Sequence, residues 1–233
     1  MQIQDKLLTP NQYSRRQKPN VPKMIVVHYV GNPGTSALGN RNYFEGLKVG
    51  SKLPNGNYRY ASSHYIVGLK GEILRCIPEN EEAIHASDGA VNASSVGIEN
   101  CHPDWTGKFN SETEKSLVEL CADICKRYKL DPIKDIVRHY DIPKANKKNC
   151  PRYWVAHPDD FERFKGDVQK FMGIDSQEMK IQETVNGLLN TKRADNKTAV
   201  SLDPNYWTKV FKGEIVATKE NIMVIMRRLL KLE

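Results

Sequence analysis

Two histidines that each follow a short apolar run constrain the fold of this chain more than any other feature. Residues 24–27 read Met-Ile-Val-Val and lead directly into His28, and Ile136-Val137-Arg138 leads into His139. A short continuous apolar run is typical of a strand that is buried on both faces. We therefore expect two buried strands, each of which presents a histidine at its carboxyl end to a common cleft.

A cysteine completes a possible metal-binding set. Cys150 lies eleven positions after His139, in the segment Lys147-Lys148-Asn149-Cys150-Pro151. Two neutral imidazoles and one thiolate are a three-ligand zinc set with an open fourth position, and nearby positive charge favours the thiolate. The plainer interpretation stays open, because strand-end histidines are often hydrogen-bonded edge residues and free cysteines often fill cores.

Composition limits the class of protein. A length of 233 residues allows one sizeable domain, or one domain with a small appendage. Hydrophobic residues at 39% and charged residues at 27% indicate a globular protein, and no apolar run is long enough to span a bilayer. Residues 1–6 lack the apolar stretch of a secretory signal, so we expect synthesis in the cytoplasm without export by that route.

The net charge of +7 suits a polyanionic partner, either nucleic acid or the anionic polymers of a bacterial wall. No nucleic-acid-binding motif accompanies the basic residues, so we predict no nucleic-acid partner. The same charge is also compatible with an ordinary basic protein. The five cysteines have no paired spacing, which argues against a disulfide framework, and four are predicted to be structural: Cys76, Cys101, Cys121 and Cys125.

The predicted elements follow the order β-α-β-β-β-α-β-α after a polar N-terminal segment over 1–23. The fold class is therefore α/β, with a mixed central β-sheet flanked by helices. Ser111 is the predicted N-cap of the long helix, with Glu114 completing a capping box. The strands of this order are expected at 24–30, 60–67, 72–77, 96–100 and 136–138, and the helices at 38–49, 111–128 and 158–171. Residues 83–86 are predicted as a further short strand.

The residue pattern changes at Gly173-Ile174-Asp175-Ser176, from alternating strand and helix patterns to helical patterns only, and this change predicts a domain boundary. Downstream, apolar residues recur only at helical spacing, for example Ile181, Val185 and Leu188. We interpret 176–233 as a small all-helical C-terminal domain, too short to form a large core alone. It carries the aromatic pair Tyr206-Trp207, and the boundary leaves 1–173 as the larger domain.

Several motifs occur in one order along the chain: His28 after a buried strand, Ala83-Ile84-His85-Ala86, Ser95-Val96-Gly97-Ile98-Glu99, Arg138-His139 and Lys148-Asn149-Cys150-Pro151. Over about residues 20–172 this set resembles the zinc-dependent type 2 N-acetylmuramoyl-L-alanine amidases, which include phage endolysins and the peptidoglycan recognition proteins. The resemblance implies a Zn²⁺ enzyme that cuts peptidoglycan between N-acetylmuramic acid and L-alanine. As a phage or prophage endolysin, it would reach the wall after release from the cytoplasm. The resemblance makes 1–173 the catalytic domain. The segment 202–207 is similar to the small helical tails of phage and bacterial wall enzymes, which makes 176–233 a candidate wall-binding domain.

The resemblance also implies roles for individual residues. The implied set consists of the metal ligands His28, His139 and Cys150, the catalytic residues Glu99 and Lys148, and the substrate-binding residues His85, His64 and Asn92. One departure concerns the catalytic tyrosine that some relatives place before the second-strand histidine. Here Ser63 precedes His64, so that role cannot be carried over.

The implied chemistry suits these residue types. Glu99, on the same strand face as Gly97, would take a proton from water and pass it to the departing amine. Lys148 would stabilise the tetrahedral oxyanion. A surface carboxylate and a solvated loop lysine are the plainer interpretations of the same two residues.

Two other functions stay open. A peptidoglycan recognition module has the same fold without catalysis, but such modules typically lack the cysteine ligand, so Cys150 argues against it. A bacterial autolysin would use the same chemistry as an endolysin. The oligomeric state and the type of peptidoglycan are not predicted.

Overall fold

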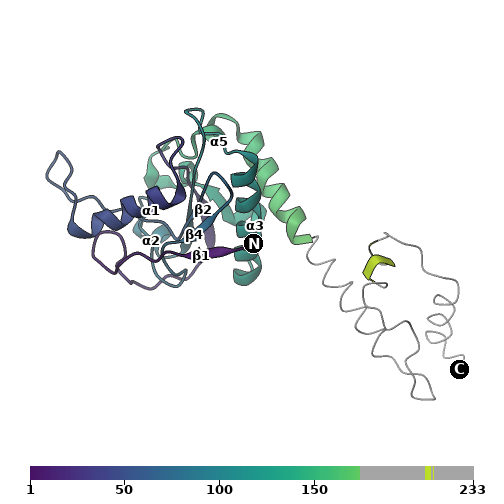
Figure 1. Ribbon diagram of the computed structural model, residues 1–233, viewed down its shortest axis with the longest axis horizontal. Coiled ribbons are helices and arrows are strands. Elements are labelled where there is room, and N and C mark those ends of the chain that lie inside the picture. Colours follow the sequence, from purple (N-terminus) through teal and green to yellow (C-terminus); the bar gives the residue numbers. More distant parts are fainter. Residues whose placement is uncertain (174–207, 211, 213–233) are drawn as a thin grey trace, which may run out of the picture. The chain divides into compact units, whose positions relative to one another are not determined.

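Six strands form one mixed sheet in the computed structural model, which describes residues 1–173, 208–210 and 212 (Figure 1). The strand order is β1-β4-β3-β5-β2-β6, with only β3 and β4 antiparallel to each other. The predicted mixed sheet is confirmed. The strands are β1 Ile3–Asp5, β2 Met24–Val27, β3 Tyr65–Val67, β4 Ile73–Arg75, β5 Ser95–Asn100 and β6 Ile136–Arg138.

The register of the central strands determines where the site forms. Strand β2 lies between β5 and β6 and is parallel to both, with Val27 opposite Ile98 and Arg138. The next residue of β2 continues the ladder, because the His28 amide donates to the Ile98 carbonyl at 2.8 Å. Carboxyl ends of parallel strands meet at one edge, where α/β proteins place their ligands. His28, Glu99 and His139 therefore share this edge.

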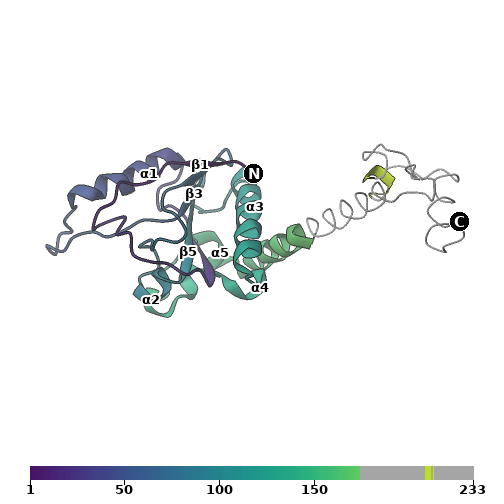
Figure 2. The same ribbon diagram turned by 90° about the horizontal axis from the view of Figure 1, so that it is seen from below.

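Helices cover both faces of the sheet. Figures 1 and 2 show the strands between α1 on one side and α3 on the other. Helix α1 packs Phe44 against a core that includes Ile66 and Leu74, and α3 buries Leu117, Leu120 and Ile124. The helices are α1 Ala37–Gly46, α2 Gly89–Asn92, α3 Ser111–Tyr128, α4 Pro132–Asp135, α5 Arg152–Ala156 and a helix over 158–173, with 3₁₀ turns at Leu47–Val49, His139–Asp141 and Pro143–Ala145.

The predicted strand over 83–86 is wrong, because those residues are irregular. The amides of His85 and Ala86 donate to the side-chain oxygen of Asn92, at 3.0 and 2.8 Å, instead of to a neighbouring strand. A side chain seven residues downstream thus satisfies the backbone groups that a strand would pair. Conversely, β1 lies within the segment predicted to be a polar wrap, and it pairs with β4 at the edge of the sheet.

The capping residue of α3 is also corrected. Asn110 is the N-cap, since its side-chain oxygen accepts from the Thr113 amide at 2.9 Å. The predicted cap Ser111 is the first helical residue, and its hydroxyl bonds to Glu112. Glu114 pairs with Arg163 instead of completing a capping box. Asparagine takes the position because its amide also donates to the Leu69 carbonyl, which ties the helix start to the β3–β4 turn.

The chain divides into two units, Met1–Phe171 and Met172–Glu233. The expected helical stripes and the Tyr206-Trp207 pair lie outside the described residues; within that part of the chain, 208–210 are helical. All five cysteines are free and buried. Among the described residues, no helix has both the length and the apolar character needed to cross a membrane.

Candidate functional site

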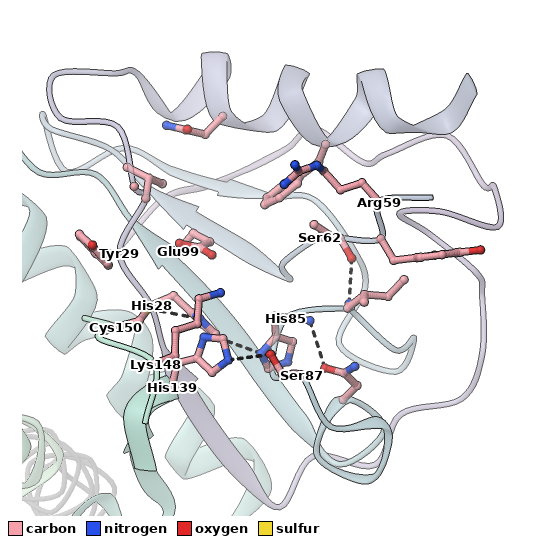
Figure 3. Close-up of a pocket in the computed structure, with 18 of the residues that line it drawn as sticks. His28, Tyr29, Arg59, Ser62, His85, Ser87, Glu99, His139, Lys148 and Cys150 are labelled. Carbon is pink, nitrogen blue, oxygen red and sulfur yellow. Dashed lines mark hydrogen bonds between the residues drawn. The ribbon is translucent and has the colours of Figure 1, made fainter. Parts of the chain in front are cut away.

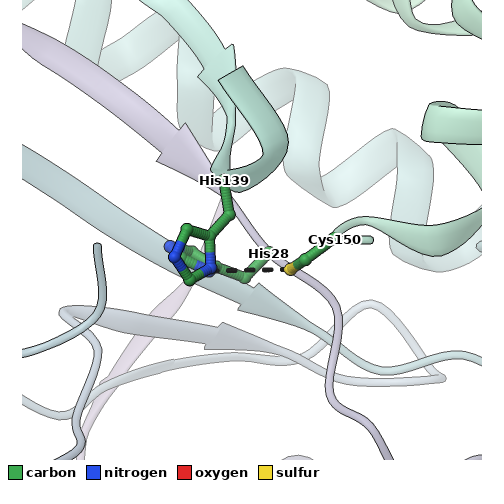
Figure 4. A group of neighbouring side chains, drawn as sticks. All are labelled: His28, His139 and Cys150. Atoms are coloured by element: carbon green, nitrogen blue, oxygen red, sulfur yellow. Dashed lines mark hydrogen bonds between the residues drawn. The ribbon is translucent and has the colours of Figure 1, made fainter. Parts of the chain in front are cut away.

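The two strand-end histidines and Cys150 meet at the carboxyl edge of the sheet (Figure 4). One ligand atom from each of His28, His139 and Cys150 lies within 4.8 Å of the others, and all three residues are buried. The sulfur of Cys150 is 3.7 Å from His28 Nδ1. The loop that carries Cys150 is held beside β6, because the Tyr140 amide donates to the Cys150 carbonyl at 2.9 Å.

Each histidine has one ring nitrogen engaged with the protein and one facing the cluster. His28 Nε2 is 3.0 Å from His85 Nδ1, so its Nδ1 faces the sulfur. His139 Nε2 is 3.3 Å from the Ser87 hydroxyl, while its buried Nδ1 has no hydrogen-bond partner. A buried polar atom without a partner costs free energy and needs an explanation. A metal ion at the centre of the three ligand atoms would supply one.

Burial controls the ionisation of the cluster. It holds the pKa of His28 well below its usual range and lowers that of His139 to about 4, so both rings are neutral at pH 7. Neutral imidazole is the form that binds metal. Burial also raises the pKa of the Cys150 thiol, and the charge of Lys148 only partly opposes this. The charge of Lys148 favours the thiolate, as expected, but burial outweighs it, so a bound metal would have to displace the thiol proton.

Glu99 and Lys148 line the same pocket as the cluster, and Figure 3 shows both directed toward it. Glu99 extends from β5 on the sheet face that carries Gly97 and the ring of His85. Its Oε2 is buried without a hydrogen-bond partner, and burial raises the pKa of this carboxyl to about 8, which the charge of Lys148 partly offsets. A carboxyl with this pKa exchanges protons near neutral pH, as a general acid–base group must.

The pocket has a volume of about 750 Å³ and opens beside the three candidate ligands. Three basic side chains belong to its lining: Arg16, Arg59 and Lys148. Catalytic zinc sites keep three protein ligands and one open position. The donor set, the unpartnered Nδ1 of His139 and the adjoining pocket all fit such a metal.

The sequence matches the N-acetylmuramoyl-L-alanine amidase family over residues 17–153. This chain belongs to that family. N-acetylmuramoyl-L-alanine amidase CwlL of Bacillus licheniformis is 38% identical over 174 residues, which are 70% of this chain and 45% of that protein. The amidase BlyA of Bacillus subtilis is 36% identical over 168 residues, 64% of this chain and 42% of that protein. The chain thus matches a little under half of the length of these relatives.

Solved structures agree with the fold. A mutant endolysin from Bacillus subtilis is 24% identical, covers 72% of this chain and 98% of that chain, and has a TM-score of 0.57. The PlyG catalytic domain is 23% identical, covers 74% of this chain and 96% of that chain, and has a TM-score of 0.59. At these identities the structural similarity establishes the fold of this chain but not the roles of individual residues.

The three residues expected to bind substrate have different surroundings in this amidase family member. His85 and Asn92 line the pocket, but His85 has both ring nitrogens engaged, with His28 and with the Ser95 hydroxyl. The Asn92 side-chain oxygen holds the 85–86 backbone. His64 is fully buried and does not line the pocket; its Nδ1 accepts from the Gly97 amide and its Nε2 bonds to the Glu81 carbonyl.

Sequence reasoning missed several residues that line the pocket or contact its histidines. Arg16 and Arg59 lie in irregular segments with no periodic pattern, so no local signal points to them. Ser87 and Ser95 contact His139 and His85 through their hydroxyls. Ser95 begins the motif 95–99 and Ser87 follows the motif 83–86, and these positions were the available clue.

Proposed function

We propose that this chain is a zinc-dependent N-acetylmuramoyl-L-alanine amidase that hydrolyses the bond between the lactyl group of N-acetylmuramic acid and L-alanine in peptidoglycan. The observation that carries the proposal is the cluster of His28, His139 and Cys150 at the edge of an open pocket. Membership of the amidase family supports the reaction and the substrate class. The proposal includes a catalytic domain over 1–173 and a wall-binding domain over 176–233.

Zinc suits the donor set better than other common metals. Two imidazole nitrogens and a thiolate sulfur are ligands that Zn²⁺ takes in tetrahedral sites, whereas Mg²⁺ and Ca²⁺ prefer oxygen. Zinc held by these residues would supply Lewis acidity, which makes water a better nucleophile and the amide carbonyl a better electrophile. The remaining chemistry belongs to side chains of the pocket.

Glu99 would move the proton. Its carboxylate accepts a proton from the attacking water and donates it to the nitrogen of L-alanine as the carbon–nitrogen bond breaks. The products are a free lactyl carboxyl group and a free α-amino group. The pKa of about 8 in the metal-free protein shows that the surroundings of Glu99 favour the protonated form, as proton donation requires. The charge of Lys148 favours the carboxylate, as proton acceptance requires.

Lys148 would stabilise the charge that develops on the carbonyl oxygen. It lies two residues before Cys150 and lines the pocket, and its charge affects the pKa values of His28, His139 and Glu99. A cation that already lies beside the reacting carbonyl needs little reorganisation in the transition state. Lysine is a point charge on a flexible stem, so arginine at this position would not be an equivalent replacement.

A non-catalytic recognition module is the alternative function, and a wall digest separates the two. Purified cell walls are incubated with the full chain, and soluble products are analysed by mass spectrometry and by labelling of new amino groups. The proposal predicts stem peptides with a free L-alanine amino terminus and glycan fragments with intact lactyl groups. Binding to walls without release of amino groups would favour the recognition module. New reducing ends would indicate a glycosidase and contradict the amidase assignment.

A further inference from the structure

His85 lies behind a candidate metal ligand in a position that the surrounding residues determine closely. Its ring lies against Gly97 of β5, where a side-chain Cβ would come within 2.5 Å of the ring carbon Cγ. Asn92 holds the backbone of His85 and Ala86 through two hydrogen bonds. The residue is 9% exposed. The hydrogen bonds from Asn92 therefore fix the backbone of His85, and the ring occupies space that is open only because residue 97 is glycine.

A chain of hydrogen bonds runs from the backbone through this ring to His28, and Figure 3 shows its last link, between the two histidine rings. The Ser95 hydroxyl is 2.6 Å from the Val91 carbonyl oxygen and 3.1 Å from His85 Nε2. A hydroxyl has one proton, and a carbonyl oxygen can only accept, so that proton points to Val91. The hydroxyl oxygen must then accept from His85 Nε2–H.

The proton positions on the rings of His85 and His28 follow from the number of donors that each ring has. Both rings are buried and neither is hydrogen-bonded to a carboxylate, so each is treated as a neutral imidazole with one proton. A neutral ring protonated at Nε2 has a bare Nδ1, so His85 Nδ1 can only accept. It lies 3.0 Å from His28 Nε2, which must donate. His28 Nδ1 is then unprotonated, and it faces the Cys150 sulfur at 3.7 Å.

We propose that His85 is a positioning residue, which fixes His28 in the tautomer whose Nδ1 lone pair points at the metal position. The inference rests on the proposed zinc site. It assigns to His85 a role other than substrate binding, because neither of its ring nitrogens is available to a substrate. Metal-binding histidines commonly donate their second ring N–H to a fixed acceptor, and loss of that acceptor weakens metal binding or activity about 10–100-fold.

Zinc affinity tests this role directly. We would measure the zinc dissociation constant by competition with a chromogenic chelator for the full chain, His85→Phe and Ser95→Ala. Phenylalanine keeps a ring against Gly97 but cannot accept from His28, so we expect about 10–100-fold weaker binding. Ser95→Ala removes one oxygen and leaves the His85 ring in place, so it keeps the test valid if His85→Phe does not fold. We expect a smaller loss for it, because the His85 proton can then occupy either nitrogen.

His64→Phe is the matched control. His64 is also fully buried and hydrogen-bonded through both ring nitrogens, but it contacts none of the candidate zinc ligands. We expect it to lower the free energy of unfolding and leave the zinc dissociation constant close to that of the parent chain. Unchanged zinc affinity in both His85→Phe and Ser95→Ala, with weaker substrate binding alone, would overturn the proposal.

Imidazole nitrogen chemical shifts give a readout that needs no metal. Long-range ¹H–¹⁵N spectra of the metal-free chain should show His28 and His85 both protonated at Nε2, and Ser95→Ala should show His85 in mixed tautomers. A proton on Nδ1 of His28 would contradict the inference. If the parent chain binds no zinc but shows these tautomers, the proposed function fails and the hydrogen-bond chain stands. If zinc binds and His28 has the other tautomer, only this inference fails.

Discussion

Glu79 and Glu99 lie in the same unit of the chain, but their surroundings shift their pKa values in opposite directions. Glu79 is buried and accepts hydrogen bonds from the Tyr65 hydroxyl at 2.8 Å, the Tyr128 hydroxyl at 2.9 Å and both terminal nitrogens of Arg127. Burial opposes its ionisation, but the bonds from Arg127 and Tyr65 outweigh burial and lower its pKa. Glu99 instead has a buried oxygen without a partner and a pKa raised to about 8.

The difference teaches how to separate structural from functional polar groups. A buried carboxylate with all its hydrogen bonds made contributes to the fold, and nothing remains for a ligand. A buried carboxyl group without them costs stability, and such costs concentrate at functional sites. Glu79 ties α3 to the segment after β4, and Glu99 faces the candidate metal ligands.

The largest effect should come from Glu99→Gln. The amide cannot accept the water proton, so we expect a loss in kcat of about 10²-fold or more, the range for a general acid–base residue. Zinc content should be retained and the free energy of unfolding should not fall, because Glu99 makes no hydrogen bond through Oε2. Amino-group release from soluble muropeptides gives kcat, and urea unfolding gives stability. Near-parental turnover would mean that another group moves the proton.

Glu79→Gln should instead lower stability and leave kcat unchanged. Its loss leaves Arg127 and two tyrosines without a charged acceptor. Since the Arg127 side chain is 41% exposed, water compensates part of the loss. We expect the free energy of unfolding to fall by about 1–3 kcal/mol, less than the ~3–5 kcal/mol of a fully buried pair. Zinc affinity should not change. A drop in kcat without a drop in stability would break the distinction between the two glutamates.

The pH dependence of stability should differ in sign between these variants in metal-free protein. Glu99 has a folded pKa of about 8, above its ordinary value of 4.5, so the folded state holds a proton that the unfolded state has lost between those values. Stability contributed by Glu99 thus falls as pH rises through this window. Glu99→Gln should gain stability relative to the parent chain from pH 5 to 8.

Glu79 has a lowered folded pKa, so its contribution is present above 4.5 and is lost as pH falls through the folded pKa. The deficit of Glu79→Gln relative to the parent chain should therefore shrink below pH 4.5. Urea unfolding across this pH range, with each variant compared with the parent chain at the same pH, cancels the contribution of the buried histidines. Slopes of the same sign would contradict the opposite environments assigned to the two carboxyls.

The smallest effect concerns a polar group outside both clusters. Asn110 caps α3 and bonds to Leu69, whereas the Ser111 hydroxyl bonds only to exposed Glu112. Asn110→Ala should cost about 1 kcal/mol, the usual value for an N-cap, and Ser111→Ala close to nothing. Urea unfolding of both variants measures the difference. A larger loss of unfolding free energy in Ser111→Ala than in Asn110→Ala would contradict the assignment of Asn110 as the N-cap.

Sequence patterns predicted the parts of the site that depend on strand ends. His28, Glu99 and His139 meet because three parallel strands end at one edge, and the apolar runs before the histidines signalled two of those ends. The ionisation of Cys150 could not be predicted, since the charge of nearby lysines is visible in a sequence and the depth of burial is not. The environment of His85 depends on Ser95 and Gly97, whose contacts require the folded chain.

Zinc stoichiometry with ligand variants tests the central claim most directly. The parent chain, His28→Ala, His139→Ala and Cys150→Ser are dialysed against buffered zinc, and metal per chain is determined by atomic emission. His157→Ala serves as control, because His157 is exposed and its ring hydrogen-bonds to the Tyr153 carbonyl of α5, away from the candidate ligands. We predict one zinc per chain in the parent and control, with strongly reduced zinc and activity in each ligand variant. Full zinc retention in His28→Ala and His139→Ala, with folded protein, would contradict the assignment.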